Sequence, residues 1–129
     1  MLKKDCLFCQ IISRTIPSKI VYEDDDTLAF LDINPTENGH ILIIPKVHFD
    51  NFSSTPLNYL NATVRASLAV VALLKKKLNP DGFNYLSNEN EIAGQVINHF
   101  HLHIIPRFSK DNKMSKKLDV EEVYKILTK

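Results

Sequence analysis

The sequence predicts an α+β domain in which a mostly antiparallel sheet of about five strands is crossed by one long helix, with short helices near the two ends. Three observations carry this prediction. Polar and apolar residues alternate strictly over 99–104, a nearly continuous apolar run covers 39–45, and helical periodicity follows Thr55. The chain has 129 residues, enough for one domain with a hydrophobic core, and its 44% hydrophobic and 24% charged content is typical of globular proteins.

Bulk composition argues against several classes of protein. The chain has 16 basic and 15 acidic residues, a net charge of +1, which gives no basis for nucleic-acid binding through bulk charge. Its apolar runs are too short to predict a membrane span or a signal-peptide core, so we expect a cytoplasmic protein. Its two cysteines form one C-x-x-C, which indicates metal binding or redox chemistry more than a disulfide framework.

The N-terminal elements are a short helix and a hairpin. An amphipathic stretch from Gln10 predicts a helix that stops before Pro17. Strands over 20–22 and 27–31 predict a hairpin with the acidic residues 23–26 at its tip. Adjacent carboxylates at a tip repel one another, so we interpret the acidic run as a solvated turn and not as a magnesium site.

The long helix is predicted to begin with Thr55 as N-cap and Pro56 at the first helical position. Periodicity predicts a stripe buried against the sheet, formed by Leu57, Leu60, Val64, Leu68, Val71 and Leu78. A turn at 79–82 leads into a fourth strand over 83–87. Near the C-terminus, Asp119 opens a capping box, and a helical stripe follows at Val120, Val123, Tyr124 and Leu127.

The most informative stretch is 99–105, where His99, His101 and His103 alternate with apolar residues. In a strand that ends at Pro106, all three imidazoles share one face. One metal held by all three is unfavourable, because His99 and His103 would lie about 13 Å apart. A histidine-rich strand without function is the simplest alternative, but three histidines at a strict period of two favour chemistry, and neutral imidazole is a competent nucleophile toward phosphorus.

Two motifs then identify a family. Gly39 to His48 has the pattern G-H-x-L-x-I-P-K-x-H, and Gly94 to Arg107 has the pattern G-Q-x-x-x-H-φ-H-φ-H-φ-φ-P-R, where φ is apolar. Together, in this order and spacing, they resemble the histidine-triad (HIT) superfamily of nucleotide hydrolases and transferases. The resemblance covers a core of about 6–107, and 108–129 would be a tail with a short helix.

The resemblance implies hydrolysis at the α-phosphorus of nucleoside 5′-phosphoramidates or related nucleotidyl conjugates, with a purine nucleotide as the bound part. His101 would form a covalent nucleotidyl-histidine, His103 and His40 would hydrogen-bond the phosphate and leaving group, and a nucleoside monophosphate would be released without a catalytic metal. A dinucleoside polyphosphate hydrolase and a non-catalytic nucleotide-sensing adaptor are the alternatives.

The resemblance also implies which residues bind the nucleotide. Asp32 would hold the ribose hydroxyls, and Asn88 the α-phosphate region. The base pocket would be lined by Leu7, Phe8, Ile16 and Ile33, which composition alone would make core residues. The phosphate would meet backbone N–H groups at Gly94, Gln95 and Val96. Many relatives have Ser or Thr where this chain has Val96, which bears on leaving-group preference.

A structural zinc site and a homodimer are also implied. Cys6 and Cys9 are half of a zinc site. His48 and His99 complete it, at positions that match a Cys-Cys-His-His zinc set in many bacterial members; two buried thiols packing as apolar groups are the alternative. Family members pair as homodimers in which two sheets join across a twofold axis.

Overall fold

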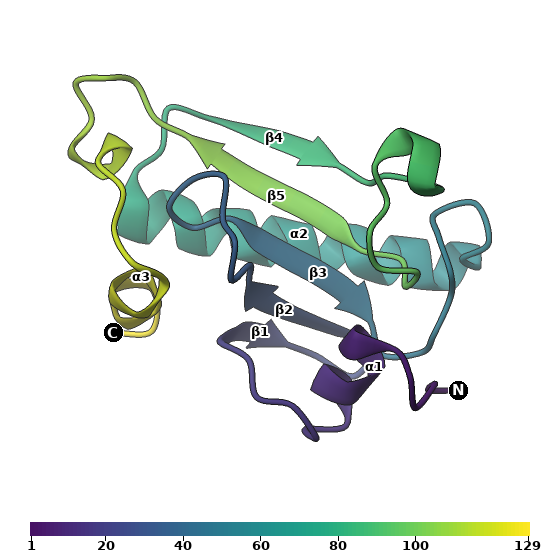
Figure 1. The fold of residues 1–129 in the computed structure, drawn as a ribbon. Coiled ribbons are helices and arrows are strands. Elements are labelled where there is room, and N and C mark those ends of the chain that lie inside the picture. Colours follow the sequence, from purple (N-terminus) through teal and green to yellow (C-terminus); the bar gives the residue numbers. More distant parts are fainter.

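The computed structural model describes residues 1–129 and has a five-stranded sheet crossed on one face by a long helix (Figure 1). The strand order is β1-β2-β3-β5-β4, and all neighbours are antiparallel. The strands are β1 (Ile20–Glu23), β2 (Thr27–Leu31), β3 (Ile41–Pro45), β4 (Gly82–Leu86) and β5 (Leu102–Arg107). The helices are α1 (Leu7–Ile12), α2 (Leu57–Leu78) and α3 (Val120–Leu127), with short 3₁₀ turns at Glu91–Ala93 and Lys113–Ser115. The predicted α+β fold is confirmed.

The two faces of the sheet bury different clusters. Toward α2, the strands contribute Ala29, Leu31, Ile41, Ile43 and Ile104. On the opposite face, Leu28, Phe30, Leu42 and Ile44 pack with α1. His103 pairs with Leu42 across β5 and β3, and directly paired residues share a face. The triad strand therefore presents His103 on the α1 side, away from α2.

The histidine-rich stretch is only partly a strand, which corrects the prediction. β5 begins at Leu102, because the ladders end at Ile43 opposite Leu102 and at Leu86 opposite His103. His99 and His101 precede the strand, in a segment where Phe100 N–H donates to the Phe49 carbonyl. Pro106 does not end β5 either. β3 pairs with β5 only as far as Ile104, so the missing N–H of Pro106 interrupts no ladder with β3.

Helix α2 begins one residue later than predicted. Pro56 is its N-cap and makes no side-chain cap bond, whereas Thr55 Oγ1 donates to the Asn51 carbonyl. At the other end, Asn79 takes the left-handed conformation (φ 50°) and closes the helix.

The buried face of α2 also differs from the predicted stripe, of which only Leu78 is fully buried. Small and medium residues line the buried face: Ala62, Thr63, Ala66, Ser67, Val70, Leu74 and Leu78. Leu57, Val64 and Leu68 are 71%, 57% and 69% exposed. Small side chains let α2 lie close to a sheet whose isoleucines supply the bulk. The helix therefore carries a second apolar face that this chain does not cover.

By length and composition α2 could cross a membrane, with a mean hydropathy of 1.4 over 18 residues. The expectation of no membrane span rested on the shortness of continuous apolar runs, and α2 reaches this hydropathy although polar residues divide its apolar runs. Its buried face packs on the sheet, and the core helix of a folded domain passes the same test.

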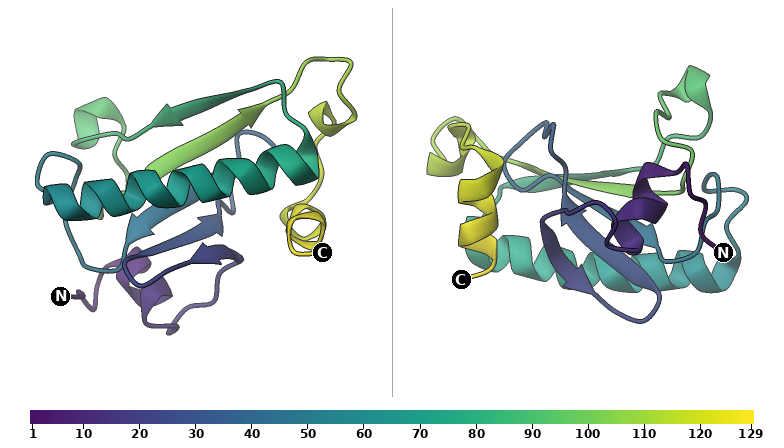
Figure 2. Two further views of the ribbon diagram at one scale, coloured as in Figure 1. Left: turned by 180° about the vertical axis from the view of Figure 1, so that it is seen from behind. Right: turned by 60° about the horizontal axis from the view of Figure 1, so that its bottom comes forward.

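Helix α3 lies at the opposite end of the molecule from α1 and packs against α2 (Figure 2). The carboxylate of Asp119 accepts from Glu122 N–H, which is the N-cap half of the predicted capping box. Val123 and Leu127 are buried, which confirms the predicted C-terminal stripe.

Gly39→Ala should lower the free energy of unfolding by about 1–3 kcal/mol, as overpacking and a strained positive φ predict. Gly39 has φ +83°, and a Cβ there would lie 2.6 Å from Leu78 Cδ1 and 3.0 Å from Leu74 Cδ2. Gly82→Ala is the matched control, because a Cβ at Gly82 meets nothing within 4 Å. Urea denaturation should separate the two variants, and equal stabilities would contradict the packing described for Gly39.

Candidate active site and metal centre

His101 lies just before β5, and its ring is oriented by the backbone. Its Nδ1 is 2.7 Å from the carbonyl oxygen of His99. A carbonyl only accepts, so Nδ1 carries the proton and Nε2 keeps a free lone pair. Burial lowers the pKa of His101, which keeps the ring neutral at pH 7. A neutral imidazole with a fixed tautomer is the arrangement a nitrogen nucleophile needs.

His40 and His103 form a second oriented pair. Thr36 N–H donates to His40 Nδ1 at 3.1 Å, so the proton of neutral His40 is on Nε2. That Nε2 lies 2.9 Å from His103 Nδ1 and donates to it. The proton of His103 is then on Nε2. Burial lowers the pKa of both rings, that of His103 to about 4, so the pair is neutral and ends in an N–H donor.

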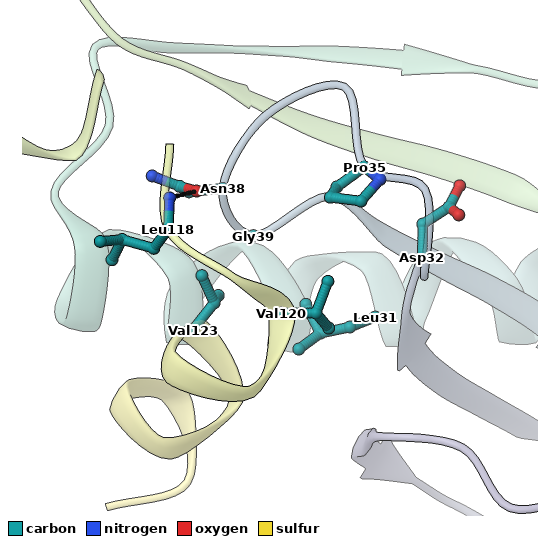
Figure 3. A pocket seen from close by; sticks show the side chains of 8 residues that line it. All are labelled: Leu31, Asp32, Pro35, Asn38, Gly39, Leu118, Val120 and Val123. Atoms are coloured by element: carbon teal, nitrogen blue, oxygen red, sulfur yellow. Dashed lines mark hydrogen bonds between the residues drawn. The ribbon is translucent and has the colours of Figure 1, made fainter. Parts of the chain in front are cut away.

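Asp32 follows β2 beside this pair. Its Oδ1 accepts from Asn34 N–H at 2.9 Å, and its Oδ2 is 3.7 Å from His40 Nε2. The carboxylate points away from the small apolar cavity on its other side (Figure 3). Asp32 is therefore placed to accept hydrogen bonds from a ligand next to the histidines.

Asp32, His40 and His103 have the ligand types of a metal site, and their ligand atoms lie within 4.8 Å of one another. The hydrogen bonds oppose metal binding. A metal on His40 Nε2 would require a lone pair there and a proton on Nδ1, where Thr36 N–H already points. The hydrogen bonds of this cluster instead place a proton on Nε2 of His40 and on Nε2 of His103.

Cys6, Cys9, His48 and His99 form a second cluster with ligand atoms within 4.8 Å of one another, as the sequence predicted. Cys9 Sγ is 3.3 Å from His48 Nδ1 and 3.5 Å from His99 Nδ1, and Cys6 Sγ is 3.5 Å from His99 Nδ1. The α1 N-terminus supplies both thiols, and the segments after β3 and before β5 supply the imidazoles. This cluster could hold a metal ion.

Hydrogen bonds outside the second cluster favour metal binding. His99 Nε2 donates to the Pro45 carbonyl at 3.1 Å, and His48 Nε2 donates to Asp50 Oδ1 at 2.8 Å. Both Nδ1 lone pairs therefore face the thiols. Such outer acceptors orient metal-binding imidazoles, and a Cys₂His₂ donor set suits zinc. Burial raises the pKa of the Cys9 thiol, so a cation is what would stabilise its thiolate.

The predicted base-pocket residues are only partly brought together. Phe8 is buried and packs edge-to-face on the His101 ring at 5.1 Å and on Phe30 at 5.5 Å, so it supports the histidine. Ile16 is half-buried at the edge of the same cluster. Leu7 and Ile33 are 41% and 75% exposed. These residues form a partly open surface and not a closed pocket.

The loop before the triad offers fewer free N–H groups than predicted. Gly94, at φ +100°, and Gln95 donate their N–H groups to the Glu91 and Asn90 carbonyls. The Val96 N–H has no protein partner, and its side chain is 87% exposed. The donor available to a phosphate is thus the Val96 amide, whereas three had been expected.

Gln95 and Asn88 have side chains that brace this loop. Gln95 is buried; its Oε1 accepts from Asn90 N–H at 2.8 Å, and its Nε2 donates to the Asp50 and Ile97 carbonyls at 2.6 and 3.0 Å. Asn88 Nδ2 donates to the Gly94 carbonyl at 3.4 Å. In the structure as it stands, both side chains hold the loop in shape.

Sequence reasoning missed several orienting residues. Asp50 accepts from His48, Thr36 N–H fixes His40, and Ser87 Oγ donates to the His101 carbonyl at 2.8 Å. Two of these contacts use backbone groups, and Ser87 reaches His101 from the residue just after β4. Only the Asp50 spacing, two residues after His48, was visible in the sequence.

Comparison with known proteins places the chain in a family. Residues 13–110 match the model of the HIT domain. An uncharacterized HIT-like protein of Methanocaldococcus jannaschii is 44% identical over 93% of this chain and 96% of its own length. The protein belongs to the HIT family, a family of nucleotide-binding proteins that includes hydrolases.

Two further relatives bear on chemistry and metal. Adenylylsulfatase HINT3 of Arabidopsis thaliana is 43% identical over 85% of this chain and 56% of its own length. The crystal structure of a zinc-bound histidine triad family protein from Mycobacterium smegmatis superposes with a TM-score of 0.85 at 33% identity, covering 95% of this chain and 90% of that one.

The free energy of unfolding should fall as the pH drops from 7 to 4. Burial lowers the pKa of His99 and His103 to about 4 in the folded chain, whereas an unfolded histidine titrates near 6.5. Between these values only the unfolded chain binds the proton, so each such histidine lowers stability by at most about 1.4 kcal/mol per pH unit. The contribution of these two histidines to the free energy of unfolding reaches its full value above pH 6.5.

His103→Asn should reduce the change in the free energy of unfolding per pH unit between pH 6.5 and 4. Urea denaturation at a series of pH values measures it, and an unchanged slope would mean that His103 is not held neutral in the folded protein.

Proposed function

We propose that this protein hydrolyses nucleotidyl conjugates at the α-phosphorus, with nucleoside 5′-phosphoramidates as the first substrate class. One observation carries the proposal: backbone groups leave His101 with an unprotonated Nε2 and His103 with an Nε2–H. A nucleophile and a donor on neighbouring rings, with centroids 4.9 Å apart, suit displacement at phosphorus.

The reaction would proceed in two steps. His101 Nε2 attacks phosphorus, an N–P bond forms, and the bond to the leaving group breaks. His103 Nε2–H and Val96 N–H hydrogen-bond the oxygens and the leaving group as negative charge grows, and an amine leaves with a proton from water. A second water then attacks phosphorus and gives a proton to the hydroxide that the first water left, the N–P bond to His101 breaks, and a nucleoside monophosphate leaves. Asp32 would accept hydrogen bonds from the ribose hydroxyls, and no step requires a metal.

Phosphoanhydride substrates are the second candidate class. Val96 offers no hydroxyl to the leaving group, which favours leaving groups that need little help from a proton donor. A relative named adenylylsulfatase, and dinucleoside polyphosphates as a chemical class, both fit this preference.

His101→Ala should lower kcat by about 10³-fold or more while nucleotide still binds, because the attacking group is lost. Quenching wild-type turnover without acid should trap a nucleotidyl adduct that peptide mapping places on His101. An adduct on His103 or His40 would refute the assignment. Binding without turnover on phosphoramidates, dinucleoside polyphosphates and adenylyl sulfate would support a nucleotide sensor instead.

We also propose that Cys6, Cys9, His48 and His99 hold one structural zinc ion, because the thiols and both Nδ1 lone pairs converge. Protein purified without chelator should contain about one zinc per chain, and Cys9→Ser should remove the metal and lower the melting temperature. Asp50→Ala keeps all four ligands but loses the acceptor for His48 Nε2–H, so zinc affinity should fall about 10- to 100-fold. Metal-free wild-type protein with unchanged stability would refute the site.

Finally, we propose a homodimer that covers the exposed apolar face of α2. Leu57, Val64 and Leu68 lie on one helical face, and the edge strand β4 exposes Tyr85 and Leu86.

Light scattering at micromolar concentration should give twice the 14.8 kDa chain mass. Leu68→Glu should give monomers, whereas Ile92→Glu, at a fully exposed apolar residue of the 3₁₀ turn, should not. If both variants are monomers, or if both remain dimers, the proposed interface is wrong.

A further inference from the structure

The connection between β2 and β3 orients two residues of the active site through backbone N–H groups. Asn34 N–H holds Asp32 Oδ1 at 2.9 Å, and Thr36 N–H holds His40 Nδ1 at 3.1 Å. The first contact fixes the carboxylate. The second fixes the tautomer of His40 and, through it, the nitrogen on which His103 carries its proton. Both depend on the conformation of residues 33–38, which belong to no helix or strand.

This loop is held to the body mainly by one buried side chain. Asn38 is 4% exposed; its Nδ2 donates to the Met114 and Lys116 carbonyls at 2.8 and 2.9 Å, and its Oδ1 accepts from Leu118 N–H at 3.0 Å. The other polar side-chain contact from the loop to the body is the exposed pair of Glu37 and Arg107 at 3.5 Å, and exposed ion pairs contribute little.

The partner of Asn38 is the C-terminal segment 113–120, which leads into α3. Val123 and Leu127 anchor α3 in the core. Pro35 of the loop and Gly39 just after it face Leu118 and Val120 across a cavity of about 10 Å³, room for no more than about one water (Figure 3). The loop and the C-terminal segment are therefore packed directly on each other.

We propose that Asn38 is a positioning residue through which the C-terminal segment sets the orientation of Asp32 and the tautomer of His40. Its consequence for turnover rests on the function proposed above, but the hydrogen-bond arrangement itself exists without substrate. Without the Asn38 contacts, the Thr36 amide is no longer held against His40, and the proton of His40 is free to occupy either nitrogen.

Asn38→Ala removes all three hydrogen bonds and is compared with Asn112→Ala. Asn112 is the same residue type in the same region and also makes three bonds, from Nδ2 to the Asn79 carbonyl and Asp81 Oδ2, and from Met114 N–H to Oδ1. It does not contact the 33–38 loop.

Long-range ¹H–¹⁵N spectra of the imidazoles report the tautomers directly. We expect His40 to be the Nε2–H form in wild type and Asn112→Ala, and a mixture of both forms in Asn38→Ala. His40 unchanged in Asn38→Ala, or changed equally in Asn112→Ala, would overturn the proposal.

Hydrogen exchange of the wild-type protein gives a test that needs no variant. If the C-terminal segment holds the loop, the Thr36 and Leu118 amides open together, and their protection factors should agree within about threefold. Thr36 exchanging about 100-fold faster than Leu118 would overturn the proposal. Neither measurement uses substrate, so an inactive protein with both results as expected would refute the proposed reaction and leave the role of Asn38 intact.

Discussion

The hydrogen bond from His101 Nδ1 to the carbonyl of His99 is the constraint on which the two sites depend. It fixes the tautomer of His101 through the backbone of a residue whose own side chain faces the two thiols. His99 is fully buried and held from behind by the Pro45 carbonyl. The proposed nucleophile and the proposed zinc site therefore share His99, so a shift of one moves the other.

Backbone groups do most of the orienting in this molecule. Thr36 N–H and the His99 and Pro45 carbonyls decide which nitrogen of three separate imidazoles carries a proton. Backbone N–H and carbonyl groups do not ionise, so these assignments persist where burial lowers the pKa of the rings. This explains how five histidines in a small chain take distinct roles without a charged partner for each.

The fold could be predicted from the sequence wherever pattern and burial agree. In the hairpin, the β3 run and the C-terminal helix, the apolar pattern matches the burial: β2 and β3 are buried on both faces and α3 on one, and the structure has them where predicted. The α2 stripe failed because Leu57, Val64 and Leu68 form a second apolar face, and periodicity cannot tell which of two such faces meets the sheet. β5 began late because a strand needs partners, and alternation alone does not show where β3 and β4 end.

The candidate site, like the fold, could be predicted from the sequence only in part. The C-x-x-C suggested half of a metal site, the resemblance to the HIT family added His48 and His99, and the structure brings the ligand atoms of all four residues within 4.8 Å of one another. The loop around Gly94 was harder, since which N–H groups remain free depends on the turn that Gly94 and Asn90 adopt at positive φ. Contacts such as Ser87 to the His101 carbonyl join distant segments and leave no local pattern.

The hydrogen bonds that orient the imidazoles of the two clusters run in opposite directions, and this difference has a consequence for metal selectivity. Counted by ligand type, both clusters could take a divalent ion, and a histidine-rich active site is open to poisoning by any zinc that exchanges freely around it. Here the far nitrogen of His48 and of His99 donates a hydrogen bond, whereas the far nitrogen of His40 accepts one. The direction of three hydrogen bonds thus favours a cation beside the thiols and disfavours one at the cluster of Asp32, His40 and His103.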